Sequence, residues 1–223
     1  MTTQESLDRA DQLQRDHPTD DYYTRAPLLI RLIERRRLAI IERLLGEVTG
    51  LDLAEVGCGG GHVLRRFPHA RLTAIDPSGL ALQSARTQLQ GYTVRFIHGA
   101  VEDLDLAAAS FDRIVCTEVL EHTRDPELVL RTIARLLRPT GIAVITVPND
   151  PLIHRMKALA RLPPGCCFVR GKLDWGGQDY HAHMWTPAAF EQILARHLRV
   201  VERDAAPARI LPIRACFKCV LHP

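Results

Sequence analysis

The stretch that decides the fold is EVGCGGGH at residues 55–62, where an apolar run ends in a turn made mostly of glycine. The residues before it, LDLAEV at 51–56, are typical of a buried strand. A side chain at Gly57 or Gly59 would keep the backbone away from a ligand, and glycine also permits the unusual φ values of such a turn. The loop therefore predicts a binding shelf at the carboxyl end of a sheet, where open α/β folds bind their ligands.

Strands and helices alternate on both sides of this loop. Before it, apolar residues at helical spacing predict a helix at 27–45. After it, we expect helices at 62–67, 78–90, 126–137 and 188–197, and further strands at 71–76, 93–99, 111–119, 142–148, 197–204 and 214–223. Strands separated by helices of about 10–15 residues form parallel βαβ units with right-handed crossovers. The sequence therefore predicts an α/β fold with a mostly parallel sheet.

Length and composition are those of one globular domain. The chain has 223 residues, of which 46% are apolar and 25% charged, and this allows one full α/β core but not two. We expect a single domain over residues 1–223 with an N-terminal helical cap at 1–48. Residues 149–186 break the strand–helix rhythm over a length far beyond an ordinary connection, so we expect a substrate lid there.

Charge and hydropathy argue against several classes of partner. A net charge of +3 and a pI near 8.6 are too balanced to indicate a nucleic-acid surface. We interpret the arginines between Arg31 and Arg43 as a solvated helix face rather than a phosphate-binding stripe. The first 25 residues hold no apolar signal segment, and no run approaches about 18 apolar residues. We expect a cytoplasmic protein without membrane or nucleic-acid partners, and its oligomeric state is left open.

Acidic residues follow the predicted strands at the edge where the glycine loop lies. Glu55 precedes the first glycine by two positions, and Asp76 ends the second strand, where a carboxylate can accept hydrogen bonds from both hydroxyls of a ribose. The third strand is followed by GAVEDL at 99–104, and the fourth contains FD at 111–112 and ends in TEVLEH at 117–122. Taken together, these five ordered segments resemble the class I methyltransferases that use S-adenosylmethionine (SAM), closely over about residues 50–150.

The resemblance implies a Rossmann-like class I methyltransferase fold, with a seven-stranded mostly parallel sheet, helices on both faces and an antiparallel C-terminal strand. It also implies SAM as the methyl donor. The glycines would cradle the methionine part of SAM, Glu55 would orient its amino group or the loop, and Asp76 would bind the ribose. The implied SAM-binding residues are Glu55, Gly57, Cys58, Gly59, Gly61, Asp76, Pro77, Ala100, Val101, Glu102 and Thr117.

Two parts of the implied SAM site stay open. Relatives commonly carry an acidic residue directly after the glycine at 99, where this chain has Ala100. The adenine amino group would then be recognised by Glu102, by Asp103 or by backbone groups. Tyr22, Tyr23 and Arg25 would either close over the methionine carboxylate or belong to a loose tail.

A metal site is a second hypothesis. Glu118, Glu121 and His122 stand at i, i+3 and i+4, so one helical turn would bring them to one face. His181 in the lid is a further ligand, and oxygen-rich sites of this kind suit Mg²⁺ or Mn²⁺. The combination resembles small-RNA 2′-O-methyltransferases and ubiquinone-biosynthesis O-methyltransferases, and matching the later H-x-x-x-W-T selects His181 over His183. Without a metal, Glu118 would pack near SAM, and His122 or His181 would be the catalytic base.

The acceptor is predicted from the lid. Its apolar and aromatic residues, among them Met156, Trp175 and Trp185, suit a small organic molecule. We expect O-methylation of a hydroxylated small molecule, of a secondary-metabolite, quinone-like or sugar-like kind, with Mg²⁺ assistance as an open question. Two alternatives are an N- or C-methyltransferase without metal and an RNA 3′-terminal 2′-O-methyltransferase. The RNA enzyme would need a basic track that the lid offers only sparsely, and a regulator that only binds SAM would not need the clustered Glu and His residues.

Overall fold

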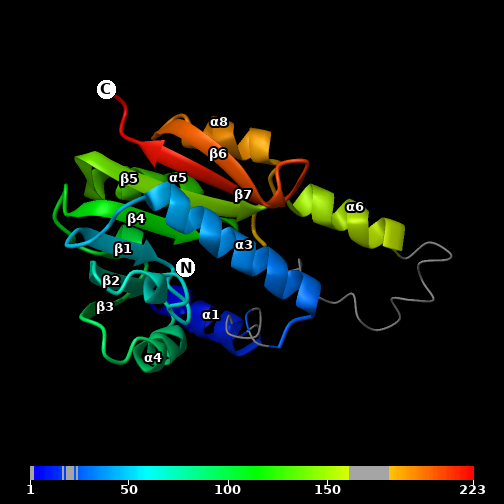
Figure 1. Ribbon diagram of the computed structural model, residues 1–223. Coiled ribbons are helices and arrows are strands. Elements are labelled where there is room, and N and C mark those ends of the chain that lie inside the picture. Colours follow the sequence, from blue (N-terminus) through cyan, green and yellow to red (C-terminus); the bar gives the residue numbers. More distant parts are fainter. Residues whose placement is uncertain (1–2, 17, 19–22, 24, 161–180) are drawn as a thin grey trace.

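The computed structural model describes residues 3–16, 18, 23, 25–160 and 181–223 and builds them around one seven-stranded sheet (Figure 1). The strands are β1 (Asp52–Val56), β2 (Arg71–Asp76), β3 (Val94–His98), β4 (Phe111–Thr117), β5 (Leu137–Pro148), β6 (Arg199–Ala208) and β7 (Leu211–Val220). Their order across the sheet is β3-β2-β1-β4-β5-β7-β6. Strands β1 to β5 pair in parallel, whereas β7 is antiparallel to both β5 and β6. The predicted Rossmann-like sheet with its antiparallel C-terminal strand is confirmed.

Helices cover both faces of the sheet (Figure 1). The helices are α1 (Thr3–Asp16), α3 (Leu28–Leu45), α4 (Gly79–Gln88), α5 (Pro126–Leu136), α6 (Asp150–Ala160) and α8 (Pro187–Leu194), and the 3₁₀ turns are η1 (Leu64–Arg66), η2 (Val101–Asp103) and η3 (Leu120–His122). Helix α3 packs across β5, β7 and β6 on one face, and α5 and α8 pack on the other. Side chains alternate between the faces along each strand, so Leu53 joins the core under α3 and Ala54 the core under α5.

Helix boundaries follow local chemistry. Helix α4 begins after Ser78, whose hydroxyl accepts a hydrogen bond from Ala81 N, and α8 begins in the same way after Thr186. The helix predicted at 62–67 is wrong, because only the 3₁₀ turn η1 forms there. Pro68 follows directly, and a residue before proline is driven out of the α region. Phe67 accordingly has a φ of −124° and a ψ of 61°.

Two further differences concern the start of β5 and the N-terminal segment. Strand β5 begins at Leu137, five residues before the predicted start, and Leu137 pairs with Phe111 beyond an irregularity in the ladder. Helix α1 lies within the helical cap expected at 1–48, but no separate helix was predicted there, because its sequence is almost wholly polar. It packs against α4, and the carboxylate of Asp11 accepts a hydrogen bond from the Ser78 hydroxyl at 2.7 Å. None of the helices in these described segments is both long and apolar enough to span a membrane.

Candidate functional site

A cavity of about 890 Å³ opens at the carboxyl ends of β1, β2 and β4. That volume lies in the upper part of the range of small-molecule pockets, about 300–1,000 Å³. Its walls come from the glycine loop, from η2 and η3, and from helices α1, α3 and α6. The implied SAM-binding residues that line it are Glu55, Gly57, Cys58, Gly59, Asp76, Pro77, Ala100, Val101, Glu102 and Thr117. The sheet therefore brings together in one cavity residues that are far apart in sequence.

Asp76 is built into the glycine loop. Gly59 N donates a hydrogen bond to its Oδ2 at 2.8 Å, and Ser78 N donates to its Oδ1 at 2.8 Å. The carboxyl group is buried, and burial raises its pKa to about 6 against the two backbone bonds that lower it. A carboxylate oxygen can accept a second hydrogen bond. Asp76 is therefore positioned to accept two hydroxyl donors from a ligand beside the loop.

Two of the glycines have different structural roles. Gly57 has a φ of +70°, and a Cβ there would lie 2.2 Å from Val119 Cγ2, so only glycine fits. Gly61, unlike the other implied SAM-binding residues, is not among those that line the cavity. A Cβ on Gly61 would instead lie 3.0 Å from Leu89 Cδ1 and 3.4 Å from Ala85 Cβ. Gly61 thus allows the loop to pack closely on the end of α4.

The predicted adenine end of the cavity is formed by η2 and the residue before it. Ala100, Val101 and Glu102 line the cavity, and Asp103 does not. Burial raises the pKa of Glu102. Of the acidic candidates left open by the sequence, Glu102 is therefore the one that the fold brings to the cavity wall.

A buried arginine forms another part of the wall. Arg37 of α3 is 5% exposed, so the interpretation of the early arginines as a solvated face is wrong at this position. Its guanidinium donates to Glu34 Oε2 and to the Tyr23 hydroxyl, each at 2.7 Å. Arg37, Glu34 and Tyr23 all line the cavity, and so does the buried Glu55. Tyr22, proposed beside Tyr23, lies outside the described residues. Sequence reasoning missed Arg37 because burial of one arginine in a run cannot be read from spacing.

Glu118 is not part of the cluster that the other predicted metal ligands form. It has a φ of +55°, so it stands off the turn that carries Glu121 and His122, and the single helical face expected for all three does not form. Its Oε1 accepts a hydrogen bond from the Thr146 hydroxyl at 2.9 Å, and its Oε2 lies 3.1 Å from Arg214 Nε. Glu118 lines the cavity as the partner of an arginine.

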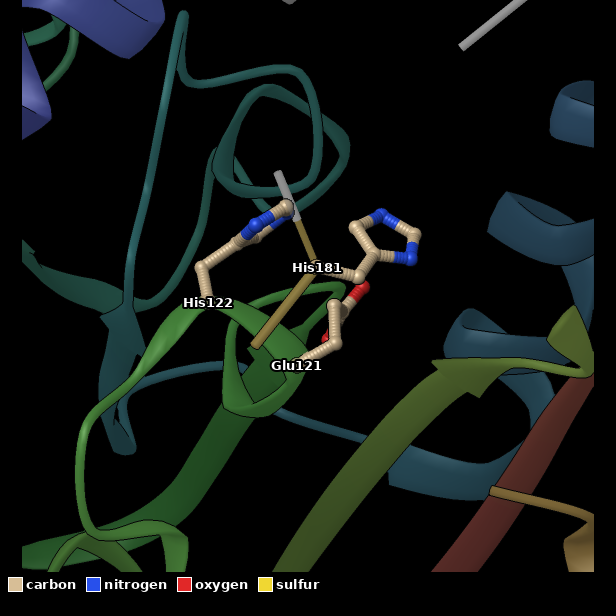
Figure 2. Close-up of side chains that lie close together, drawn as sticks. All are labelled: Glu121, His122 and His181. Carbon is tan, nitrogen blue, oxygen red and sulfur yellow. The ribbon is translucent and has the colours of Figure 1, made fainter. Parts of the chain in front are cut away.

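Three of the four predicted metal ligands do meet. Figure 2 shows Glu121 and His122 on the turn after β4 and His181 reaching them from a distant segment. One ligand atom from each lies within 4.8 Å of the other two, and the rings of His122 and His181 are 4.9 Å apart in an edge-on arrangement. All three line the same cavity that the glycine loop lines.

Burial at this cluster favours a positive ion. Glu121 is 1% exposed, and its Oε2 accepts no hydrogen bond from any residue that the structure describes. Desolvation raises the pKa of Glu121 well above its usual range, and the negative charge of Glu118 raises it further. A buried carboxylate of this kind is stable in its charged form only beside a cation. The donor set of one carboxylate and two imidazoles therefore fits a divalent metal ion.

Backbone bonds hold His181 in place. Ala182 N and His183 N both donate to Glu121 O, at 2.8 and 3.2 Å. The His181 ring has its Nδ1 at 3.0 Å from Asp150 Oδ2. The His183 ring is directed elsewhere, with Nε2 at 3.1 Å from Thr123 O. This arrangement places His181 rather than His183 at the cluster.

Known proteins place this architecture in a family. Residues 54–145 match the family model described as a methyltransferase domain. The ubiquinone biosynthesis O-methyltransferase of Caulobacter vibrioides is 35% identical over 164 residues, covering 69% of this chain and 63% of that protein. The mitochondrial protein of the same name from Schizosaccharomyces pombe is 30% identical over 139 residues, covering 57% of this chain and 50% of that protein. The chain belongs to the class I SAM-dependent methyltransferases.

Solved structures agree on the fold. The N-methyltransferase NodS from Bradyrhizobium japonicum WM9, in complex with S-adenosyl-L-homocysteine, superposes with a TM-score of 0.68 at 21% identity over 100% of both chains. The PH0226 protein from Pyrococcus horikoshii OT3 gives a TM-score of 0.68 at 14% identity, over 95% of this chain and 99% of that one. At these identities the likeness concerns the class I methyltransferase fold alone.

The sequence matches cover only part of the relatives and, for the family model, only part of this class I methyltransferase. The chain spans less than two thirds of the length of the curated relatives that it matches first, 63% for the Caulobacter vibrioides protein. The family model begins within β1 and ends within β5, so it includes the glycine loop, Asp76 and the turn with Glu121 and His122. Asp150 and His181 lie beyond it.

Proposed function

We propose that the chain is a SAM-dependent methyltransferase that methylates a hydroxyl of a small quinone-like or catechol-like acceptor. The observation that carries this proposal is the meeting of Glu121, His122 and His181 in the same cavity as the glycine loop and Asp76. A methyl donor and a hydroxyl acceptor would lie in one enclosure with ionisable side chains between them. The curated relatives, named as ubiquinone biosynthesis O-methyltransferases, support an acceptor of this class.

The donor side has a role for each wall of the cavity. SAM supplies a methyl group on a positively charged sulfur, which reacts when a nucleophile approaches in line. Asp76 would accept hydrogen bonds from the ribose hydroxyls, and Glu102 would lie at the adenine end. Arg37 provides a buried positive charge near the loop. We assign it to the methionine carboxylate, because a buried guanidinium binds a carboxylate strongly.

The acceptor side must remove a proton. Glu121, His122 and His181 would hold Mg²⁺ or Mn²⁺, and the ion would lower the pKa of a bound hydroxyl. In its absence His122 or His181 is the base within reach. Glu118 would act through its pairing with Arg214 rather than as a ligand. The proposed lid over 149–186 contributes Met156 of α6 to the apolar wall, whereas Trp175 lies outside the described residues.

The test is methyl transfer to an alkyl-substituted catechol, with a matching monophenol and an amine as alternative acceptors. The enzyme is stripped with EDTA and assayed with and without added Mg²⁺ or Mn²⁺. We expect chelation to lower the rate and the ion to restore it, with O-methylated catechol as the product. Methylation of the amine in EDTA would instead favour the metal-free N-methyltransferase.

Two variants separate metal assistance from simple base catalysis. Glu121→Gln and His181→Ala should lose the response to added ion, whereas His183→Ala, two residues away and bonded to Thr123 O, should keep it. A wild-type rate that EDTA leaves untouched, together with an active His181→Ala, would show that the metal assignment is wrong.

A further inference from the structure

Asp150 is a buried carboxylate whose position capping does not explain. It is the first residue of α6 and is 1% exposed. The backbone of α6 is capped by its neighbour, because Leu152 N donates to Asn149 Oδ1 at 3.4 Å. An acidic group in the first turn gains only a small stabilisation from the helix dipole. Burying a carboxylate costs considerably more, so the dipole alone does not account for Asp150.

The contacts of Asp150 point to His181. Its Oδ2 lies 3.0 Å from His181 Nδ1, and the His181 side chain is 12% exposed. Its Oδ1 is buried and, among the residues that the structure describes, has no hydrogen-bond partner. Asp150 also lines the cavity together with Glu121 and His122. The carboxylate thus connects β5 and α6 to the one cluster ligand that comes from beyond them.

We propose that Asp150 is a positioning residue that accepts a hydrogen bond from His181 Nδ1–H and so presents His181 Nε2 to Glu121 and His122. This proposal rests on the proposed function for its purpose, but it concerns the orientation of one ring. A neutral imidazole that donates from one nitrogen must offer the lone pair of the other. A carboxylate partner also makes that second nitrogen a stronger ligand or base.

The backbone hydrogen bonds to Glu121 O and the carboxylate of Asp150 act on different parts of His181. The bonds from Ala182 N and His183 N to Glu121 O fix where the His181 Cα lies. They do not fix the rotation of the ring about its side-chain torsions. The bond from Asp150 restricts that rotation. Removal of a carboxylate behind a ligating histidine typically weakens metal binding about 10- to 100-fold, and we expect a loss in that range here.

The first measurement uses the unaltered protein without metal. Nitrogen-15 NMR of the histidine side chains, above pH about 8 where imidazole is neutral, reports which nitrogen carries the proton. We expect His181, assigned by loss of its signals in His181→Ala, to be protonated at Nδ1. A ring protonated at Nε2 would overturn the proposal.

The second measurement compares variants by Mn²⁺ titration, followed by electron paramagnetic resonance. Affinity should fall in the order wild type, Asp150→Asn, Asp150→Ala, because asparagine keeps the acceptor oxygen and loses the charge. The matched control is Glu127→Gln, which removes the carboxylate 3.1 Å from His197 Nε2 outside the cavity. It should bind Mn²⁺ as the wild type does.

Failure of the two proposals can be told apart. If the wild type binds Mn²⁺ and Asp150→Ala binds it equally well, Asp150 does not position His181, and the proposed function stands. If no protein binds Mn²⁺, the metal part of the proposed function fails. The NMR spectra of wild type and Asp150→Asn then decide the Asp150 proposal alone: the Nδ1 proton must be present in the first, and the histidine signals must change in the second.

Discussion

The pKa of Asp76 makes SAM affinity depend on pH in a direction that can be worked out. Burial raises this pKa to about 6 from 3.8, which disfavours the charged form by about 3 kcal/mol. Ribose hydroxyls donate to a carboxylate but find one acceptor fewer on a carboxylic acid. SAM should therefore select the ionised form. At pH 5 only about one tenth of a group with a pKa of about 6 is ionised, so the Kd should be about tenfold weaker than at pH 7.5.

Calorimetry provides the assay. SAM is titrated into the protein at pH 5 and pH 7.5 in buffers of different ionisation enthalpy, so that affinity and proton release are measured together. At pH 5 about one proton should be released per SAM bound. Asp76→Asn should bind SAM weakly, and its affinity should not change with pH. Glu102→Gln removes another carboxyl group of raised pKa, at the adenine end of the cavity, and its affinity for SAM should still change with pH. A wild-type Kd that is equal at both pH values would refute the reasoning.

The same pKa predicts the pH dependence of stability without SAM. The folded-state pKa lies above the unfolded value of 3.8, so the folded chain binds the extra proton. Its contribution to stability is fully present below pH 3.8 and is lost as pH rises through about 6. Denaturant melts should therefore show Asp76→Asn gaining stability relative to wild type between pH 4 and 7. Saturating SAM should abolish most of that difference.

Two further perturbations test the cavity wall. In Gly57→Ala the substituted residue would have a φ of +70° and its new Cβ would lie 2.2 Å from Val119, whereas in the control Gly50→Ala the φ is also +70° but nothing lies within 4 Å. Thermal unfolding should show that the control loses about 1–2 kcal/mol of stability and that Gly57→Ala loses clearly more. Equal losses of stability would contradict the contact with Val119. Arg37→Met should raise the Kd for SAM at least tenfold, as expected for a lost charge-assisted hydrogen bond. The control Arg43→Met, at an exposed position, should leave the Kd unchanged. Calorimetry at pH 7.5 measures both values, and an unchanged Kd in Arg37→Met would show that Arg37 does not bind the methionine carboxylate.

Regular structure was predictable because its signal is periodic and local. The apolar strand runs that end at Val56 and Asp76 identify the sheet. The acidic residues near the ends of these runs identify the carboxyl edge of the sheet and the donor side of the cavity. Prediction failed where one neighbour or one contact decides. Pro68 stops a helix at 62–67, and polar α1 is held by its packing on α4 and by the carboxylate of Asp11.

Residues that work in pairs across the fold carry no local signal. Glu118 matches the spacing of a metal ligand, but it has a positive φ and its carboxylate pairs with Arg214. Asp150 has no motif, and its partner is 31 positions later. A polar residue within two positions of a strand's carboxyl end is the signal that could have marked Asp150, because that edge of the sheet is where ligands bind.

The bonds from Ala182 and His183 to Glu121 O make one turn responsible for three side chains. Glu121 and His122 belong to that turn, and His181 is held to its backbone through the two residues that follow it. A shift of the turn would therefore move all three side chains together and preserve their spacing.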